Sequence, residues 1–289
     1  MEILRTLDAA RSACRGLTRA GTVGLVPTMG ALHEGHISLV RRARDENDAV
    51  AVTVFVNPLQ FGAHEDLDAY PRDDEGDAAQ LQAAGADLVL FLSVDEMYPP
   101  GFATRLTQDV LSTTLEGAAR PGHFDGVLTV VCKLFHLVAP TRAYFGRKDV
   151  QQTVVVRRMV RDLDMDIDVV VCATCRDPDG LAMSSRNAYL SAAERAEGLA
   201  LVASLQTAQQ LFDTGERSAA AIEDAMLGCL RERLTREPDY AAIVRVSDFG
   251  RPDQVQAGDV AVVAAPVGPT RLLDNHVLGA KLGPLSPAP

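Results

Sequence analysis

Short apolar runs alternate with amphipathic stretches along most of the first 175 residues of the chain. The runs are rich in β-branched residues, which predicts strands that are buried on both faces of a sheet. We expect these strands at 23–26, 49–56, 86–92, 143–146 and 166–173. The stretches between them repeat apolar residues at helical spacing and predict helices at 4–20, 35–46, 76–84, 126–138 and 150–162. Strands that alternate with helices predict an α/β fold with a doubly wound, Rossmann-like, mostly parallel sheet.

The pattern changes after residue 175. The segment Arg176–Gly180 places Pro178 and Gly180 at the spacing of a tight turn, so we place a domain boundary there. We therefore expect two domains, a Rossmann-like domain at 1–175 and a smaller α+β domain at 176–289. The tail at 283–289 is rich in proline and is expected to be disordered. Beyond the boundary, helices are expected at 192–212 and 219–235, and strands at 242–247, 260–265 and 270–274.

Composition narrows the class of protein. The chain has 289 residues, of which 47% are hydrophobic, enough for a substantial core. No apolar run approaches the ~18 residues of a membrane span, and the first residues lack the apolar core of a signal peptide. Five irregularly spaced cysteines suit a reducing cytoplasm. A net charge of -11 argues against a nucleic-acid partner, so we expect a cytoplasmic protein that binds neither nucleic acid nor membrane.

The stretch from Pro27 to His36 joins a predicted strand to a predicted helix and carries the strongest candidate chemistry. Gly30 and Gly35 let the backbone approach a ligand, and the helix start offers unpaired N–H groups and the positive end of the dipole. His33 and His36 lie three residues apart on one face of the first turn, where imidazoles can bind phosphate oxygens. Two such histidines are equally compatible with a polar surface. A zinc site is a weaker alternative, because the metalloprotease helix requires His-Glu-x-x-His.

Two further polar segments, Asn57–Phe61 and Gly146–Gln152, follow predicted strands. Ligands of doubly wound sheets bind at the carboxyl ends of the strands, so we expect these segments and Pro27–His36 to meet in one pocket. Lys148 suits phosphate charge, and the hydroxyls and guanidinium of Met183–Arg186 suit a polyphosphate. Taken alone, Gly146–Gln152 would be interpreted as a structural surface turn, and Met183–Arg186 is only a weak indication. The chain has no Walker A motif and no Gly-x-Gly-x-x-Gly, so those nucleotide-binding folds are not supported.

Two clusters raise the question of a metal ion. Cys172 and Cys175 form a Cys-x-x-Cys, but no second pair of ligands accompanies them, and they follow a strand instead of opening a helix. We therefore expect a structural role for both cysteines. The acidic run that ends at Asp77 could hold Mg2+, or it could be a solvated helix start whose acids face the dipole.

His33-Glu34-Gly35-His36 matches the His-x-Gly-His signature of the nucleotidyltransferase superfamily, and Pro27–His36 as a whole resembles the pantoate–β-alanine ligase family. The resemblance extends from about residue 23 to residue 190, and a weaker similarity occurs at 270–275. It rests on further motifs that are specific in combination: Phe55–Phe61, Tyr70–Arg72, His123–Val127, Phe145–Gln152 and Met183–Asn187.

The resemblance implies an AMP-forming carbon–nitrogen ligase with ATP as a substrate and Mg2+ as a cofactor. Pantoate would attack the α-phosphate of ATP and give pantoyl adenylate and pyrophosphate. β-Alanine would then attack the activated carbonyl, so that pantothenate forms and AMP leaves. No covalent enzyme intermediate is needed, and the protein would act by positioning and charge stabilisation. The resemblance also implies a homodimer in which the second domain closes over the first.

The same resemblance implies catalytic residues. His36 matches the residue that acts as the proton donor, and His33 would bind the phosphates beside it. Lys148 and Arg186 would supply positive charge to the phosphates.

Substrate and metal contacts are implied as well. Gln60 and Gln152 would bind pantoate, and Gln60 would also bind β-alanine. Asp77 and Gln80 would lie in the Mg2+ neighbourhood. The contacts to ATP would come from Met29, Gly30, Ala31, Leu32, His33, Glu34, Gly35, His36, Gly146, Arg147, Lys148, Asp149, Cys175 through its backbone, Met183, Ser184, Ser185 and Arg186.

Three positions depart from the family pattern. Arg147 and Gly76 stand where the family usually has an acid, and Val150 stands where it usually has an aromatic residue. These departures bear on the ribose side of ATP and on the Mg2+ ligands. Two other classes remain open: another nucleotidyltransferase, such as a cytidylyltransferase, and a non-enzymatic ligand-binding protein of the same fold. The first would leave Asn57–Phe61 and Met183–Asn187 unexplained.

Overall fold

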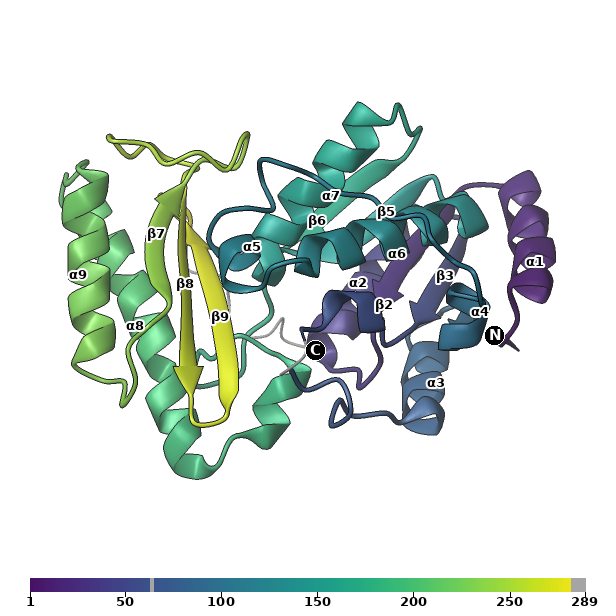
Figure 1. Cartoon of the computed structure of the whole chain (residues 1–289), viewed down its shortest axis with the longest axis horizontal. Coiled ribbons are helices and arrows are strands. Elements are labelled where there is room, and N and C mark those ends of the chain that lie inside the picture. Colours follow the sequence, from purple (N-terminus) through teal and green to yellow (C-terminus); the bar gives the residue numbers. More distant parts are fainter. Residues whose placement is uncertain (63–64, 282–289) are drawn as a thin grey trace. The chain divides into compact units, whose positions relative to one another are not determined.

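The computed structural model describes residues 1–62 and 65–281, so the tail at 283–289, predicted to be disordered, lies outside the described residues. The chain forms two compact units (Figure 1). The first consists of Met1–Gly146 and Val155–Cys172, and the second of Arg147–Val154 and the chain from Ala173 onward. The predicted domain division between residues 175 and 176 stays a prediction.

The first unit contains a six-stranded, wholly parallel sheet in the order β1-β4-β3-β2-β5-β6. The central strands are buried over nearly their whole length, because their β-branched side chains are covered on both faces. This confirms the predicted α/β, doubly wound, parallel architecture. The strands are β1 (Glu2–Leu4), β2 (Val23–Thr28), β3 (Ala49–Val54), β4 (Leu88–Phe91), β5 (Arg142–Gly146) and β6 (Asp168–Cys172).

Helices cover both faces of this sheet. On one face α2 (Glu34–Glu46) and α3 (Asp74–Ala83) enclose a core around Val52. On the other face α1 (Leu7–Ala20) packs against α6 (His123–Val138), as Figure 1 shows. The remaining helical segments are η1 (Pro58–Gln60), α4 (Val94–Met97), α5 (Glu116–Ala119) and α7 (Val150–Asp162), of which α7 begins in the second unit and ends in the first.

The prediction of a helix from residue 4 onward is wrong at its beginning. Glu2–Leu4 form the edge strand β1, which pairs in parallel with Leu88–Leu90. Helix α1 begins at Leu7, after the N-cap residue Thr6, whose hydroxyl accepts the N–H of Ala9 at 3.4 Å. A strand of three residues is too short to show a period, and its pairing partner is distant in the sequence, so no local pattern indicates it.

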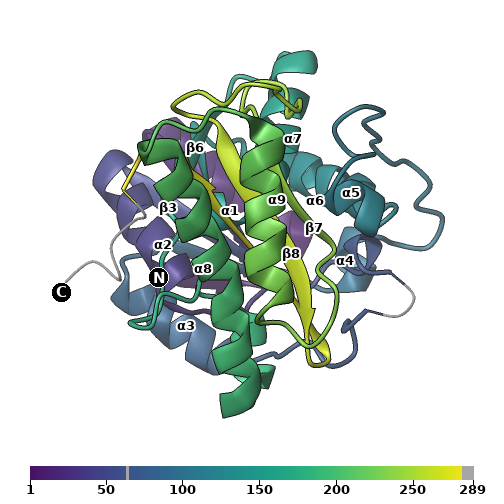
Figure 2. The same cartoon turned by 90° about the vertical axis from the view of Figure 1, so that its left-hand side faces the viewer.

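The second unit contains the antiparallel sheet β7-β8-β9, formed by Tyr240–Val244, Val260–Val267 and Thr270–Val277. Figure 2 shows α8 (Ala192–Asp213) and α9 (Ala219–Arg231) side by side over one face of this sheet. The predicted smaller α+β part is therefore confirmed. The unit also contains two 3-10 turns, η2 (Arg147–Asp149) and η3 (Ser185–Tyr189).

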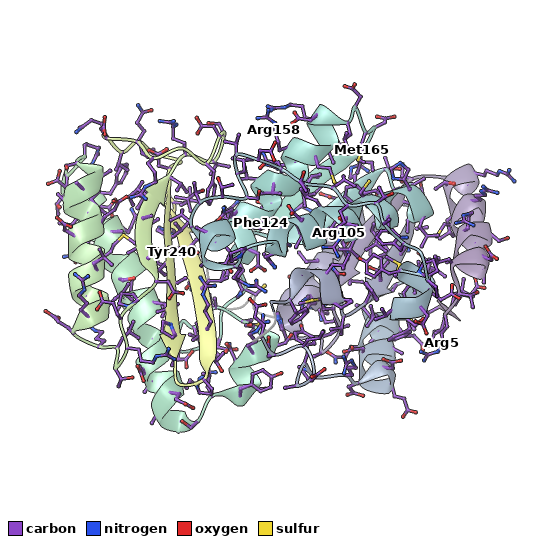
Figure 3. The ribbon with its side chains drawn as sticks, in the orientation of Figure 1. Arg5, Arg105, Phe124, Arg158, Met165 and Tyr240 are labelled. Atoms are coloured by element: carbon purple, nitrogen blue, oxygen red, sulfur yellow. The ribbon has the colours of Figure 1, made fainter. Side chains whose placement is uncertain are left out.

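Charged and apolar side chains separate as expected for a folded chain in water. Arg5 and Arg158 are exposed, whereas Phe124 on α6 is buried, and all three are labelled in Figure 3. No helix within residues 1–62 and 65–281 combines the length and the apolar character that a membrane span needs.

Candidate active site

Strand order reverses beside β2 in the first unit. The chain passes from β2 to β3 and β4 on one side, whereas β5 pairs with β2 on the other side and is followed by β6. In doubly wound sheets such a reversal marks the edge at which ligands bind, outside the carboxyl ends of the strands. The segment Pro27–His36 leaves β2 at this edge, and residues 147–152 follow β5 in the sequence.

The loop between β2 and α2 turns sharply. Gly30 has a φ of +83° and Ala31 a φ of +50°, so two successive residues are left-handed. Glycine adopts this conformation freely, but alanine is strained in it and must be held by its surroundings. The hydroxyl of Thr28 accepts the N–H of Gly30 at 3.3 Å and donates to the carbonyl of Thr53 at 2.8 Å. The start of the turn is therefore anchored to the end of the sheet.

Asp77 on α3 holds the rest of this turn. Its two carboxylate oxygens accept the backbone N–H of Ala31 at 2.9 Å and of Leu32 at 2.8 Å. The side chain is only 2% exposed, and burial raises the pKa of Asp77, an effect that the two amide hydrogen bonds oppose. The carboxylate thus contacts the turn directly.

The two histidines lie at the start of α2. His33 is the N-cap residue, and its Nδ1 accepts the N–H of Gly35 at 3.1 Å. The Nδ1 of His36 accepts the N–H of His33 at a longer 3.4 Å, and the two rings lie 4.1 Å apart. Because each Nδ1 is an acceptor, a neutral ring carries its hydrogen on Nε2. Both side chains can therefore donate from Nε2 to an anion at the helix N-terminus.

The side-chain amide of Gln60 has a fixed orientation. Asn57 donates from Nδ2 to Gln60 Oε1 at 2.9 Å, and the Asn57 Oδ1 in turn accepts the hydroxyl of Tyr98 at 2.8 Å. Gln60 Nε2 then points to the sulfur of Met29 at 3.1 Å. The structure thus brings the predicted pantoate residue next to the histidine loop within one unit.

A partly buried polar network lies behind Gln60. Its carbonyl accepts from Arg120 Nη2 at 3.1 Å and from His123 Nδ1 at 2.9 Å, and Glu65 pairs with Arg120 at 2.6 Å. Burial, reinforced by the charge of Arg120, lowers the pKa of His123 to about 4, so this ring is neutral at pH 7. The sequence patterns do not indicate the role of Arg120; the available signal is an arginine three residues before His123, at the start of the His123–Val127 motif.

In the second unit, β9 holds the turn that contains Lys148. Asn275 donates from Nδ2 to the carbonyls of both Arg147 and Lys148, each at 2.8 Å. Beside it Asp274 forms a two-pronged ion pair with Arg176 at 2.6 and 2.9 Å. Both side chains of this pair are almost fully buried. The sequence signal that could have indicated these residues is the run of three polar side chains at 274–276 within β9.

The Met183–Arg186 segment is ordered by its own backbone and side chains. The N–H of Met183 donates to the carbonyl of Cys175 at 3.0 Å, and Ser184 Oγ accepts the N–H of Arg186 at 3.3 Å. The backbone of Cys175, which was expected to contact the nucleotide, is therefore joined to the Met183–Arg186 segment. Cys172 and Cys175 are both reduced cysteines, outside any disulfide.

The arrangement around Asp77 fits Mg2+ poorly. Mg2+ requires near-octahedral oxygen ligands and keeps several waters, whereas both oxygens of Asp77 already accept amides and the side chain is buried. Gln80, the other predicted ligand, is exposed. In the part of the chain that the structure describes, no group of three or more His, Cys, Asp or Glu side chains could hold a metal ion. The metal role of Asp77 and Gln80 stays a prediction.

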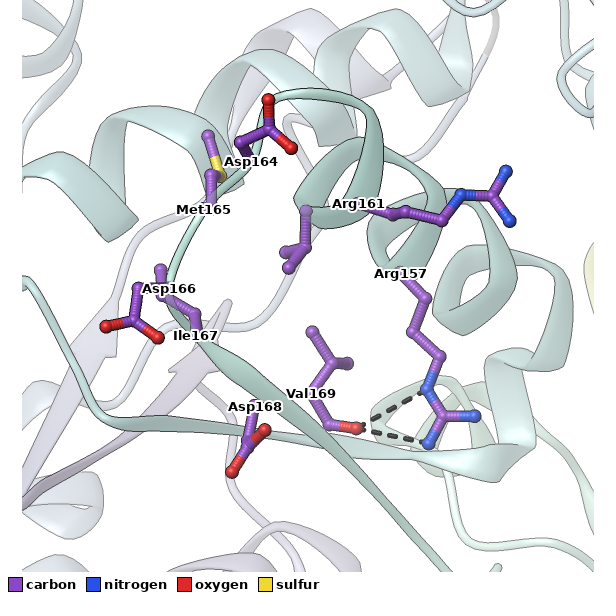
Figure 4. Close-up of a pocket in the computed structure, with 9 residues that line it drawn as sticks. Arg157, Arg161, Asp164, Met165, Asp166, Ile167, Asp168 and Val169 are labelled. Carbon is purple, nitrogen blue, oxygen red and sulfur yellow. Dashed lines mark hydrogen bonds between the residues drawn. The ribbon is translucent and has the colours of Figure 1, made fainter.

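A separate hollow of about 520 Å³ lies at the other edge of the sheet (Figure 4). It is lined by the end of α7 and the beginning of β6, and Arg157 donates from Nε and Nη2 to the carbonyl of Val169 there. Because the strands are parallel, this is the edge opposite to the histidine loop. The hollow is therefore not the candidate active site.

The structure brings the predicted site residues together in two groups, one in each unit. Residues 29–36 lie with Gln60 and Asp77 in the first unit, and residues 183–186 lie with Cys175 in the second, in which Asn275 also holds the Lys148 turn. The individual roles given to these residues stay predictions.

Comparison with known proteins gives a consistent result over the length of the chain. The family model described as pantoate-beta-alanine ligase matches residues 2–277. A pantothenate synthetase from Roseiflexus castenholzii is 50% identical over 280 residues, which is 97% of this chain and 100% of that protein.

Two crystal structures are also similar. The pantothenate synthetase from Thermus thermophilus has a TM-score of 0.92 and 48% identity, and the match covers 96% of this chain and 99% of that one. The pantoate-beta-alanine ligase from Francisella tularensis, complexed with beta-gamma ATP and beta-alanine, has a TM-score of 0.78 and 29% identity, over 98% and 100% of the two chains. The chain therefore belongs to the pantoate–β-alanine ligase family.

Proposed function

We propose that the chain joins pantoate to β-alanine in an ATP-dependent reaction that passes through pantoyl adenylate and releases pyrophosphate and AMP. Membership of the family supports the condensation of pantoate with β-alanine. The Francisella relative was crystallised with beta-gamma ATP and beta-alanine, which supports ATP as a substrate. A carboxylate is a poor acceptor for an amine at neutral pH, so activation by ATP must come before β-alanine reacts.

The contact between Gln60 and Met29 is the observation that carries this proposal. It places a directed amide donor beside the loop that bears His33 and His36. Attack of a carboxylate on a phosphate requires the two reacting atoms to lie about 3–3.5 Å apart before reaction. An amide that binds pantoate beside a loop whose imidazoles bind phosphates supports such an approach.

In the first step a carboxylate oxygen of pantoate attacks the α-phosphorus, and the bond from that phosphorus to the pyrophosphate oxygen breaks. Negative charge then grows on the departing pyrophosphate. His33 and His36 donate to it from Nε2, and His36 is the proton donor in this proposal. Their capped Nδ1 atoms keep both rings in the orientation that this requires.

In the second step the amine of β-alanine attacks the carbonyl of the adenylate, and AMP leaves with the electrons of the broken carbon–oxygen bond. Gln60 and Gln152 hold pantoate, and Gln60 also binds β-alanine. Lys148 and Arg186 stabilise the phosphates of ATP. We assign the remaining ATP contacts to Met29–Gly35, Gly146, Arg147, Asp149, Cys175 and Met183–Ser185.

Three further parts of the proposal concern the setting of the reaction. Mg2+ enters with the phosphates of ATP, and no step of the reaction passes through a metal site on the chain. Each of the two predicted domains, 1–175 and 176–289, supplies some of the contacts to the substrates. The enzyme works as a homodimer in the cytoplasm.

Pyrophosphate release without β-alanine tests the reaction. Pantoate and ATP with Mg2+ should give a burst of about one pyrophosphate per active site and then almost no turnover, because the enclosed adenylate has no acceptor. Addition of β-alanine should restart turnover and yield AMP. Release of ADP, or pyrophosphate release that does not depend on pantoate, would refute the proposal.

Two histidine variants test the role assigned to His36. His36→Ala should lower the rate of the burst by about 10²–10⁴, the usual effect of removing a positioned proton donor. His136→Ala, at an exposed position on α6, should leave the burst unchanged. A folded His36→Ala protein with a nearly normal burst would show that the role given to His36 is wrong.

A further inference from the structure

The turn that precedes α2 presents two successive backbone N–H groups to one anion. The N–H groups of Ala31 and Leu32 converge on the two oxygens of Asp77, at 2.9 and 2.8 Å. Successive amides that converge in this way form an anion-binding concavity of the kind that often cradles phosphate. In this chain the protein's own carboxylate fills it. The phosphates of ATP must therefore be bound by other groups of the loop.

The position of Asp77 explains how its carboxylate reaches the turn. It lies in the first turn of α3, whose N-cap residue Asp73 accepts the N–H of Gly76 at 2.9 Å. A Cβ added to Gly30 would lie 3.0 Å from Asp77 Oδ2, so the carboxylate packs directly against the loop backbone. The carboxylate is therefore confined by packing as well as by hydrogen bonds.

The left-handed turn needs this support. Ala31 at a φ of +50° is in a conformation that costs an L-residue other than glycine roughly 1–2 kcal/mol. Two charge-assisted hydrogen bonds from the adjacent amides offset that cost. Without them the turn would relax, and the N-cap at His33 would move with it. The geometry of the two imidazoles thus depends on a carboxylate that acts through the backbone of the loop.

A metal-binding role conflicts with the same contacts. A Mg2+ ion that keeps part of its water shell requires an accessible carboxylate, and Asp77 is 2% exposed. Each oxygen of Asp77 keeps a second lone pair, but the side chain is too deeply buried for an ion that retains part of its water shell. We infer that Asp77 is a positioning residue for the nucleotide-binding loop, acting through these two amides, and that it is not a metal ligand. This inference rests on the proposed function only in that the loop binds ATP.

The variant Asp77→Asn separates the two roles. It keeps the shape of the side chain but presents an NH2 group to one of the two N–H donors. With a positioning role, kcat/KM for ATP should fall by about 10–10² because the histidines are misplaced. The KM for pantoate and the concentration of free Mg2+ that gives half activity should not change. A parallel rise in the Mg2+ requirement would identify Asp77 as a metal ligand and overturn the inference.

Two control variants lie in the same helical turn. Glu75→Gln removes the same charge at an exposed position and should behave as the wild type. Asp73→Ala removes the cap of α3 but leaves the loop amides untouched. It should lower the urea concentration at the midpoint of unfolding, without a selective loss of kcat/KM for ATP. If Asp77→Asn is as active as Glu75→Gln, the positioning role is refuted. It is also refuted if Asp77→Asn, like Asp73→Ala, shows no selective loss of kcat/KM for ATP.

A measurement on the wild-type chain does not depend on activity or on the folding of a variant. In amide NMR spectra, Mn2+ added alone should leave the Ala31 and Leu32 signals sharp, and both amides should exchange slowly with solvent. Selective broadening of these two signals would show metal at Asp77, and fast exchange would show that the hydrogen bonds are absent; either result overturns the inference. A wild type that forms no AMP would instead refute the proposed function, and leave the NMR result standing.

Discussion

Gly126 lies where α6 meets η1, and its replacement tests how closely Gln60 is positioned. A Cβ at residue 126 would lie 2.3 Å from the carbonyl oxygen of Leu59 and 2.5 Å from the backbone nitrogen of Gln60. Ordinary contact begins at 3.4 Å, so the Leu59–Gln60 backbone must retreat by about 1.1 Å, the difference between 3.4 and 2.3 Å. The clash involves backbone atoms, which cannot move aside as the end of a flexible side chain can.

A displacement of this size should mainly affect pantoate. A misplacement of about 1 Å can lower a rate by roughly 10², so Gly126→Ala should lower kcat/KM for pantoate by about that factor. Stability should also fall, because overpacking costs about 1–3 kcal/mol whereas alanine in a helix gains only about 0.5–1 kcal/mol. AMP formation at varied pantoate, together with urea unfolding, measures both effects.

Gly16 in α1 supplies the matched control. Nothing lies within 4 Å of a Cβ at this helical position, so Gly16→Ala should retain full activity and gain about 0.5–1 kcal/mol of stability. If Gly126→Ala also gained stability and kept its kcat/KM for pantoate, the close approach of α6 to η1 would not position Gln60, and the reasoning would fail.

Three further predictions concern buried polar groups. Asp274→Ala leaves the guanidinium of Arg176 buried without its carboxylate, so the free energy of unfolding measured in urea should fall by about 3–5 kcal/mol; a loss below 1 kcal/mol would contradict this. Asn275→Ala removes the donor to two carbonyls at the Lys148 turn and should raise the KM for ATP roughly thirtyfold, at about 1 kcal/mol for each of the two lost hydrogen bonds, whereas an unchanged KM would show that the turn does not need this clamp. His123 has a pKa lowered to about 4, so between pH 6.5 and 4 the unfolded chain binds a proton that the folded chain excludes. The free energy of unfolding should therefore decrease as the pH is lowered through this range, by up to about 1.4 kcal/mol per pH unit. His123→Gln should reduce that slope, which unfolding at a series of pH values measures.

The sequence predicted those parts of the fold that depend on local patterns. Apolar, β-branched runs indicated β2 and β3, and the helix expected at 192–212 corresponds to α8. β1 was missed because three residues carry no period and pair with a strand more than 80 residues away. Its formation is a tertiary effect, which local propensity does not encode.

In the candidate site, too, local patterns indicated some features, whereas others depend on tertiary contacts. The histidine loop could be located because glycines and histidines are concentrated in one strand-to-helix turn. The contacts of Asp77 with this loop could not be predicted from the sequence, and neither could those of Asn275 with the Lys148 turn. Each contact joins segments that are distant in the sequence. An acidic residue in the first turn of a helix looks the same in sequence whether it faces solvent or holds a buried amide.

The clamp formed by Asn275 also has a consequence for the order in which the enzyme is made. Lys148 is synthesised 127 residues before the side chain that holds its carbonyl. At translation rates of about 5–20 residues per second, the ribosome needs roughly 6–25 s to add that intervening chain. During this interval the parallel sheet of the first unit can form, but the lysine turn has no donor for its carbonyls. A nascent chain thus acquires a held Lys148 turn only near the end of translation, when β9 has emerged from the ribosome.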